Sequence, residues 1–172
     1  MIQKYTYGNP FETEAIVVSV PAADGTPAYG TISTEKGFSF TYDMDDNDVV
    51  YGLGEANRGI NKRGYIYESN CSDQPDHSED KISLYGAHNF IVVSGKQTFG
   101  LFVDYPGKLR FDIGYTLSAQ LKITCEDADL YLYVIEGETP YDIVKQFRKI
   151  IGRSYIPPKF AFGFGQSRWG YT

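Results

Sequence analysis

The sequence predicts an all-β fold, an antiparallel β-sandwich followed by one helix. The chain contains 15 Tyr, 11 Phe and 18 Gly in 172 residues, a composition that suits pleated strands and tight turns. Short strand-like runs follow one another from residue 15 to residue 135, separated by Gly, Pro, Asn or Asp. In residues 108–113 and 120–125 apolar and polar side chains alternate, which indicates strands with one buried and one wet face.

Eight strand-like segments can be placed in order along this region. They cover residues 15–20, 37–42, 49–53, 89–94, 98–103, 109–113, 121–125 and 130–135. Gly95 and Lys96 connect the fourth and fifth segments, and we expect a tight type II′ turn in which Gly95 supplies the positive φ. Such a succession of short antiparallel strands is typical of a β-sandwich.

One segment departs from this pattern and predicts a helix. Thr139 suits the N-cap, Pro140 the first turn and Asp142 the positive end of the helix dipole. Apolar residues then recur at helical spacing, at Ile143, Val144, Phe147, Ile150 and Ile151. Gly152 is expected to end the helix in the left-handed conformation. The apolar stripe should pack on the edge of the sandwich or on a following domain.

Two adjacent prolines, Pro157 and Pro158, mark a boundary between two parts of the chain. Each proline restricts itself and its predecessor, so residues 154–159 are expected to form a stiff extended linker. The apolar run Phe160–Phe164 then predicts a new strand. We therefore divide the chain into a sandwich domain, residues 1–156, and a segment, residues 157–172, that holds the linker and the first strand of a truncated barrel.

Charge and hydropathy argue against several classes of partner. The formal net charge is −6, whereas a nucleic-acid partner requires a basic surface. No apolar run approaches the ~20 residues that span a bilayer, and the first residues lack the apolar core of a signal peptide. The only cysteines are Cys71 and Cys125, too few for a disulfide scaffold, so we expect free thiols and a cytoplasmic location.

Three motifs imitate ligand sites without completing them. In the glycine-rich run that starts at residue 52, Asn57 replaces the third glycine of a dinucleotide loop, and a strand with close backbone approach and a turn is expected instead. In the acidic run from residue 43, Asp48 stands where a calcium loop needs Gly, so we expect a hairpin turn. His77 and His88 are too few for a zinc site. We expect no metal and no cofactor.

The long polar stretch 57–85 is the first candidate for function, because connections of this length are usually functional or mobile. It contains His77 and four carboxylates, Asp73, Asp76, Glu79 and Asp80. Carboxylates could bind sugar hydroxyls through charge-assisted hydrogen bonds, although composition alone favours a merely solvated loop. The second candidate is Trp169, which follows the last apolar run, where α/β barrels carry active sites, and could stack on a sugar ring.

Four segments of the chain match a known family. They are Tyr51-Gly-Leu-Gly-Glu, Tyr85-Gly-Ala-His-Asn-Phe, Phe99-Gly-Leu-Phe-Val-Asp and Pro157-Pro-Lys-Phe-Ala-Phe-Gly-Phe-Gly-Gln-Ser-Arg-Trp-Gly-Tyr. Together they resemble glycoside hydrolase family 31, most of all its bacterial α-glucosidases. The resemblance implies a galactose mutarotase-like β-sandwich that leads into a (β/α)₈ catalytic barrel.

The resemblance also implies an activity that this chain does not perform alone. Family members hydrolyse α-glucosidic bonds with retention, using an aspartate nucleophile and an aspartate acid/base, which a retaining mechanism holds ~5 Å apart. In the family both come from barrel strands beyond the segment present here. We therefore expect an accessory portion of an α-glucosidase that contributes no catalytic residue. Its partners would be its own catalytic barrel domain and an α-glucoside oligosaccharide.

Two pieces of the family's sugar pocket are matched in this sequence. The run from Ser69 to Asp73 resembles a loop whose aspartate contacts the leaving-group sugar, which makes Asp73, with the nearby Asn70, a candidate for substrate binding. Ser69 stands where the family often has Trp, and one extra residue precedes Asp73. Trp169, with its neighbour Arg168, matches the aromatic that lines the glucose pocket. The resemblance thus favours a functional loop over a solvated one.

Two other functions and one association stay open. A stand-alone carbohydrate-binding sandwich would need a solvent-facing aromatic platform within residues 15–135. An aldose epimerase-like sandwich would need a base and His acids gathered on one sheet face, which the two widely placed histidines do not favour. The exposed Phe160–Phe164 strand would seek an edge, so we expect the isolated chain to form a homodimer or to aggregate.

Overall fold

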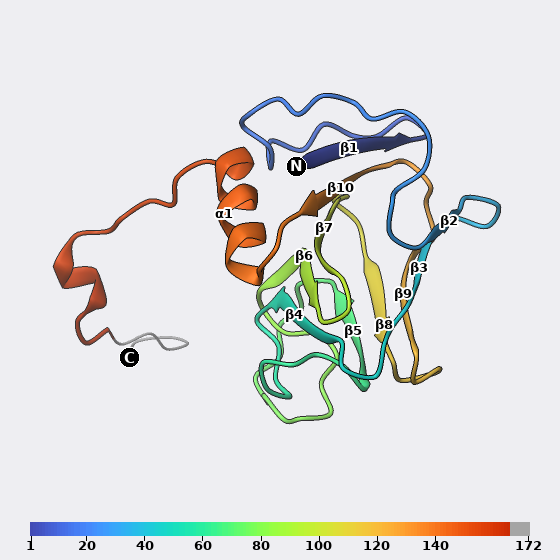
Figure 1. The fold of residues 1–172 in the computed structure, drawn as a ribbon. Coiled ribbons are helices and arrows are strands. Elements are labelled where there is room, and N and C mark those ends of the chain that lie inside the picture. Colours follow the sequence, from blue (N-terminus) through green and yellow to red (C-terminus); the bar gives the residue numbers. More distant parts are fainter. Residues whose placement is uncertain (166–172) are drawn as a thin grey trace.

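Two antiparallel five-stranded sheets and one α-helix make up residues 1–165, the part of the chain that this computed structural model describes (Figure 1). The first sheet has the strand order β1-β10-β7-β6-β4 and the second the order β2-β3-β9-β8-β5. The strands are β1 (Ile2–Tyr7), β2 (Thr31–Ser33), β3 (Phe38–Asp43), β4 (Val49–Gly54), β5 (Tyr65–Ser69), β6 (Ala87–Ser94), β7 (Thr98–Asp104), β8 (Leu109–Ile113), β9 (Gln120–Cys125) and β10 (Leu130–Glu136). The predicted all-β sandwich is confirmed.

The main core lies between the two sheets and is built from alternate residues of the strands. On β8 the side chains of Leu109, Phe111 and Ile113 are fully buried, whereas Arg110 between them is exposed. β9 repeats the pattern with a fully buried Leu121 and other inward residues. This period of two is the one that the sequence predicted for both segments, and it fixes which face of each strand meets the core.

Helix α1 (Pro140–Ile151) covers the outer face of the first sheet. Its buried residues are Ile143, Phe147 and Ile150. The ring of Phe147 stacks on that of Phe90 from β6, with 4.0 Å between centroids and 8° between planes. The sequence placed this stripe on a sandwich edge or a following domain. It packs on a sheet face instead, because β7 and β10 carry apolar side chains on both sides.

The helix begins and ends at the predicted residues. Thr139 and Asp142 form a capping box at its start. Gly152 follows its last residue with φ of 84°, but its ψ of −170° differs from the predicted left-handed cap. The carbonyl of Ile150 accepts hydrogen bonds from the N–H groups of Val17 and Val18, at 2.8 and 3.2 Å. Because residues outside the helix already donate to this terminal carbonyl, a left-handed cap is not needed to satisfy it.

Residues 15–20 form an irregular segment, so the strand predicted there is wrong. Two of its backbone N–H groups bind the end of α1 rather than a neighbouring strand. The first strand of the chain is β1, which pairs along its whole length with β10 and was not predicted. The short β2 and the edge strand β5 were also missed. β5 lies inside the predicted polar connection, pairs with β8 and buries Tyr67.

The turn between β6 and β7 is three residues long, because Ser94 pairs with Thr98. Gly95 does not have a positive φ, so the predicted type II′ turn is wrong. The missing side chain of Gly95 instead lets this turn lie close to Asp48, since a Cβ at position 95 would lie 2.1 Å from Oδ1 of Asp48. The same oxygen accepts a hydrogen bond of 2.9 Å from the N–H of Lys96.

The segment after α1 leads away from the sandwich (Figure 1). Its apolar run forms the 3₁₀ turn η1 (Lys159–Phe162) rather than the predicted strand. A lone strand would have no neighbour to satisfy its backbone groups, and here the N–H groups of Ala161 and Gly163 bond locally to Pro158 and Phe160, each at 3.0 Å. The division of the chain at residue 157 stays a prediction.

Candidate functional site

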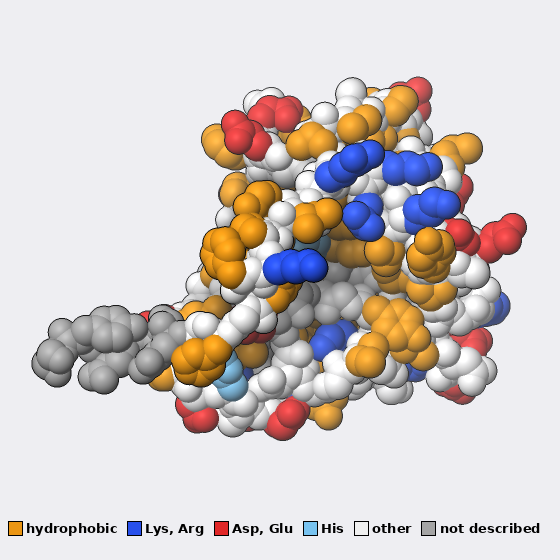
Figure 2. All heavy atoms as spheres, turned by 90° about the vertical axis from the view of Figure 1, so that its left-hand side faces the viewer, with side chains coloured by type: hydrophobic (Ala, Val, Ile, Leu, Met, Phe, Trp, Pro, Cys, Tyr) orange, Lys and Arg blue, Asp and Glu red, His pale blue; other side chains and the backbone are white. Residues whose placement is uncertain are grey.

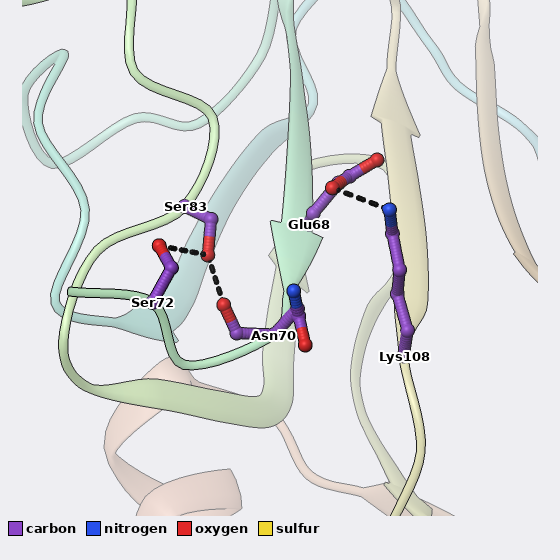
Figure 3. Close-up of polar contacts among 5 residues, drawn as sticks. All are labelled: Glu68, Asn70, Ser72, Ser83 and Lys108. Carbon is purple, nitrogen blue, oxygen red and sulfur yellow. Dashed lines mark hydrogen bonds and ion pairs between the residues drawn. The ribbon is translucent and has the colours of Figure 1, made fainter. Parts of the chain in front are cut away.

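The β5–β6 loop, residues 70–86, carries two of the predicted site residues and is closed at its base. The N–H of Ser72 donates to the carbonyl of Leu84 at 2.9 Å. The hydroxyl of Ser83 donates to the carbonyl of Asn70, and the hydroxyl of Ser72 donates to that of Ser83 at 3.4 Å (Figure 3). These contacts join the two ends of the loop, so the residues between them project as one compact unit.

An ion pair lies beside this base. Nζ of Lys108, at the end of the β7–β8 connection, is 2.8 Å from Oε2 of Glu68 on β5 (Figure 3). More than half of the Lys108 side chain is exposed, so solvent screens the pair and its contribution to stability is small. Its effect is to orient the two side chains next to Asn70.

Asp73 and Tyr85 lie near each other in the loop, and the Asp73 carboxylate raises the pKa of the Tyr85 phenol. The ring of His77 meets that of Tyr85 edge to face, with 5.4 Å between centroids. Asp73, His77 and Tyr85 thus form a small exposed cluster that presents one carboxylate, one imidazole and one phenol to solvent.

A groove of about 580 Å³ runs along the other side of the loop base. Asn70 and Cys71 line it from the loop, together with residues from β6, β7, the β7–β8 turn and the N-terminal segment that include Thr13, His88, Asn89, Asp104 and Tyr105. The Ser69 hydroxyl donates to Oδ1 of Asn89, whose Nδ2 donates to the carbonyl of Tyr105 at 3.1 Å. The amide of Asn89 therefore connects β5 with the β7–β8 turn.

Two ionisable groups of the groove are shifted by burial. Burial raises the pKa of Asp104, which is 6% exposed and accepts a hydrogen bond from the Thr13 hydroxyl. Burial also lowers the pKa of His88, whose ring lies 5.9 Å from that of Phe147. His88 is therefore neutral at pH 7 and able to donate and accept hydrogen bonds.

The structure separates the predicted site residues. Asn70 lines the groove, whereas Asp73 lies apart from it beside Tyr85. Arg168 and Trp169 lie outside the described residues. Asn89 was not predicted as a site residue, because it comes from another strand and only the sandwich brings it to the loop.

Three other sequence motifs have structural roles. The acidic run forms the β3–β4 turn, as predicted, and Asp48 is buried in it. Gly52 has a φ of 121°, and a Cβ there would lie 2.2 Å from the carbonyl oxygen of Phe90, which confirms the predicted close approach. Cys71 and Cys125 are free, as predicted.

Residues 1–165 contain neither a metal-binding cluster nor a membrane-spanning helix. In this range no group of three or more His, Cys, Asp or Glu is arranged to hold a metal ion. No helix of the same range combines the length and apolar character needed to cross a membrane.

The two antiparallel sheets with one covering helix place the chain in the class of galactose mutarotase-like β-sandwiches. The family model described as the glycosyl hydrolase 31 N-terminal galactose mutarotase-like domain matches residues 5–112. The chain therefore belongs to this family, as the sequence motifs indicated.

Curated relatives are longer enzymes. Alpha-glucosidase 2 of Bacillus thermoamyloliquefaciens is 33% identical over 147 residues, which cover 80% of this chain and 19% of the relative. An alpha-xylosidase of Lactiplantibacillus pentosus is 27% identical over 120 residues, which cover 70% of this chain and 15% of the relative. The chain thus spans less than a fifth of the length of either relative.

Two solved structures share the fold. A mutant glycoside hydrolase family 31 dextranase of Flavobacterium johnsoniae, complexed with isomaltotriose, has a TM-score of 0.70 and 25% identity, covering 77% of this chain and 16% of that one. A cycloalternan-forming enzyme of Listeria monocytogenes, complexed with a pentasaccharide substrate, has a TM-score of 0.65 and 24% identity, covering 73% and 12%. At 24% identity, the similarity to the second structure is evidence for the fold alone.

Proposed function

We propose that this chain is the accessory domain of a retaining α-glucosidase and that its β5–β6 loop forms part of the sugar pocket. The observation that carries this proposal is the loop itself. It is closed at its base and exposes its carboxylates, Asp73, Asp76, Glu79 and Asp80. A closed loop that presents anionic acceptors suits the recognition of a neutral, hydroxyl-rich ligand. Relatives named alpha-glucosidases support the choice of ligand class.

Asp73 is the proposed sugar-binding group. The Asp73 carboxylate raises the pKa of the Tyr85 hydroxyl, and a sugar hydroxyl is a donor of the same kind. Because Asp73 is exposed, a second donor can reach the carboxylate, which offers about four lone-pair sites. Asn70 would add an amide at the nearby groove, and Trp169 an aromatic face on which a sugar ring stacks.

The proposed partner is the chain's own catalytic barrel, docked on the side of the sandwich that carries α1. Tyr155 and Ile156 of the linker are 81% and 85% exposed, and exposed apolar groups of this size mark interaction surfaces. The outer side of α1 exposes Lys145, Arg148 and Lys149. Lys and Arg side chains gather on the molecular face that carries α1 and the linker (Figure 2).

The chain alone is proposed to be inactive, because retaining hydrolysis requires a nucleophile and an acid/base at a fixed separation of about 5 Å. The test is the release of glucose from maltose and isomaltose by this chain and by a longer polypeptide extended through the barrel. An inert short chain beside an active long one supports the proposal. Hydrolysis by the short chain itself would overturn it.

The role of the loop is tested in the longer polypeptide. Asp73→Asn removes the anionic acceptor and keeps its shape, so KM should rise roughly tenfold or more, the value of a lost charge-assisted hydrogen bond. Asp46→Asn is the matched control, since Asp46 is equally exposed but lies in the β3–β4 turn. Equal KM values for both variants would contradict a sugar-binding role for Asp73.

A stand-alone carbohydrate-binding function has less support. Its aromatic platform would have to come from Tyr65, Tyr85 and Tyr115, which are the exposed aromatic residues of the range 15–135. They belong to β5, to the β5–β6 loop and to the β8–β9 turn, and Tyr65 is engaged by Arg58, whose guanidinium carbon lies 4.8 Å from the ring centroid. Binding of maltose by the isolated chain, measured by calorimetry, would favour this alternative.

A further inference from the structure

The connection from β4 to β5 contains a non-glycine residue, Arg58, in the left-handed backbone conformation. Arg58 has a φ of 74°, and within residues 1–165 the only other non-glycine residue with a positive φ is Leu53. For a long side chain this region is unfavourable. Such a conformation persists only where surrounding contacts impose it, and it clusters at functional sites. The contacts of Arg58 and of its neighbour Asn57 therefore show what imposes this conformation.

These two side chains bind three successive carbonyls of the β5–β6 loop. Nδ2 of Asn57 donates to the carbonyls of His77, at 2.9 Å, and of Ser78, at 3.0 Å. Nε of Arg58 donates to the carbonyl of Glu79. Asn57 and Arg58 therefore bind the backbone of three consecutive residues, 77–79, in the middle of the loop.

Arg58 also connects the loop with the sandwich. Its Nη1 donates to the carbonyl of Ile66 on β5, at 3.1 Å. Its guanidinium carbon lies 4.8 Å from the ring centroid of Tyr65 and 5.5 Å from that of Tyr67, within the range of cation–π attraction. The planar guanidinium holds its Nε and Nη1 donors in a fixed fork, and here these two donors reach carbonyls of two different chain segments.

Lys62 holds this segment in place from inside. It is 5% exposed, and its Nζ donates to the carbonyls of Ala56, at 3.1 Å, and of Gly59, at 2.7 Å. Burial lowers the pKa of the Lys62 ammonium. The backbone on both sides of Asn57 and Arg58 is thus fixed to a buried cation.

We propose that Asn57 and Arg58 are positioning residues that hold the β5–β6 loop in the conformation in which it presents Asp73. Contacts lead from Asn57 to the backbone of His77 and from the His77 ring to Tyr85, which belongs to the same β5–β6 loop as Asp73. The part of this inference that concerns sugar binding rests on the proposed function. The part that concerns the loop does not.

Hydrogen exchange of the chain tests the loop itself. Asn57→Asp keeps the shape of the side chain but turns the donor into an acceptor facing two carbonyls, and Arg58→Lys keeps the charge without the fork. The loop amides of Ser72 and Lys81, which donate to the carbonyls of Leu84 and Ser78, should exchange on the order of tenfold faster in both variants, because a loop that is no longer held opens more often. Peptides from β7 and β10 should keep their protection. Asn47→Asp, in the exposed β3–β4 turn, is the control. Loop peptides that exchange at the parental rate would overturn the proposal.

A double-mutant cycle in the longer polypeptide tests the link to Asp73. Asn57→Asp alone should raise KM by roughly tenfold or more. If Asn57 acts through Asp73, adding Asn57→Asp to Asp73→Asn should change KM little further, whereas independent roles would give additive effects and would contradict the link. An Asp73→Asn variant with parental KM would refute the proposed function, and the exchange experiment would then decide the positioning of the loop alone.

Discussion

The hydroxyl of Tyr42 donates a hydrogen bond of 3.0 Å to the carboxylate of Asp48, and both side chains are buried. The same carboxylate accepts the N–H groups of Asp45 and Lys96, each at 2.9 Å. Asp48 thus joins the β3–β4 turn to the β6–β7 turn, at neighbouring ends of the two sheets. These three hydrogen-bond donors compensate for the hydration that the Asp48 carboxylate loses on burial.

We expect Asp48→Ala to lower the free energy of unfolding by about 3 kcal/mol, because Tyr42 would be left as a buried unpaired hydroxyl and two N–H groups would lose their acceptor. Urea denaturation of the isolated chain measures this change. Asp46→Ala, in the same turn but exposed, should alter the free energy by no more than about 0.5 kcal/mol. Equal effects of the two substitutions would contradict a structural role for the buried carboxylate.

Gly95→Ala tests the close approach of the two turns. The added Cβ would lie 2.1 Å from Oδ1 and 2.8 Å from Cα of Asp48, so the backbone of one turn must move. We expect a loss of about 1–3 kcal/mol in the free energy of unfolding, the usual cost of overpacking. Gly165→Ala is the control, since nothing lies within 4 Å of a Cβ at that position. A neutral Gly95→Ala would show that the turns separate easily.

The sequence was sufficient for the strands whose apolar residues alternate or form long runs. β8 was predicted at its exact bounds, and β3, β4, β6, β7, β9 and β10 within two residues at each end. The helix was marked by its own caps, Thr139 and Gly152. These elements carry their signals within a few residues, which is why local reasoning finds them.

The remaining features depend on contacts between distant residues. β1 is defined by pairing with β10, more than a hundred residues later, and the valines of residues 15–20 resemble a strand until their N–H groups are seen to bind α1. In the candidate site, Asp73 and Asn70 were found through a family motif. The grip of Asn57 and Arg58 on the loop has no sequence signature, because its acceptors are backbone carbonyls.

Asp104 gives a pH dependence of stability with a definite sign. Burial raises its pKa above the ordinary value of 3.8, so the folded chain holds this proton more tightly than the unfolded chain. Its contribution to stability is therefore fully present below the unfolded pKa and is lost as pH rises through the folded pKa. Asp104→Asn carries no titrating proton. The free energy of unfolding of this variant minus that of the parent, measured by urea denaturation, should increase from about pH 4 to about pH 7. A difference that stays level over this range would contradict the prediction.

We expect the isolated chain to self-associate through the apolar run after the helix. Phe160, Phe162 and Phe164 are 83%, 73% and 97% exposed, and apolar area of this kind lowers the free energy by about 25 cal/mol for each Å² that association buries. Since the run is a 3₁₀ turn and not a strand, burial of the rings rather than pairing of an edge should drive the contact.

Light scattering at micromolar concentration should therefore show a dimer or larger species. Replacing all three phenylalanines with serine should give a monomer, whereas Phe11→Ser, which removes a ring that is 69% exposed in the N-terminal segment, should leave the association unchanged. A parent chain that is monomeric under these conditions would refute the idea. Association that survives the triple replacement would instead assign it to another surface, such as the outer side of α1.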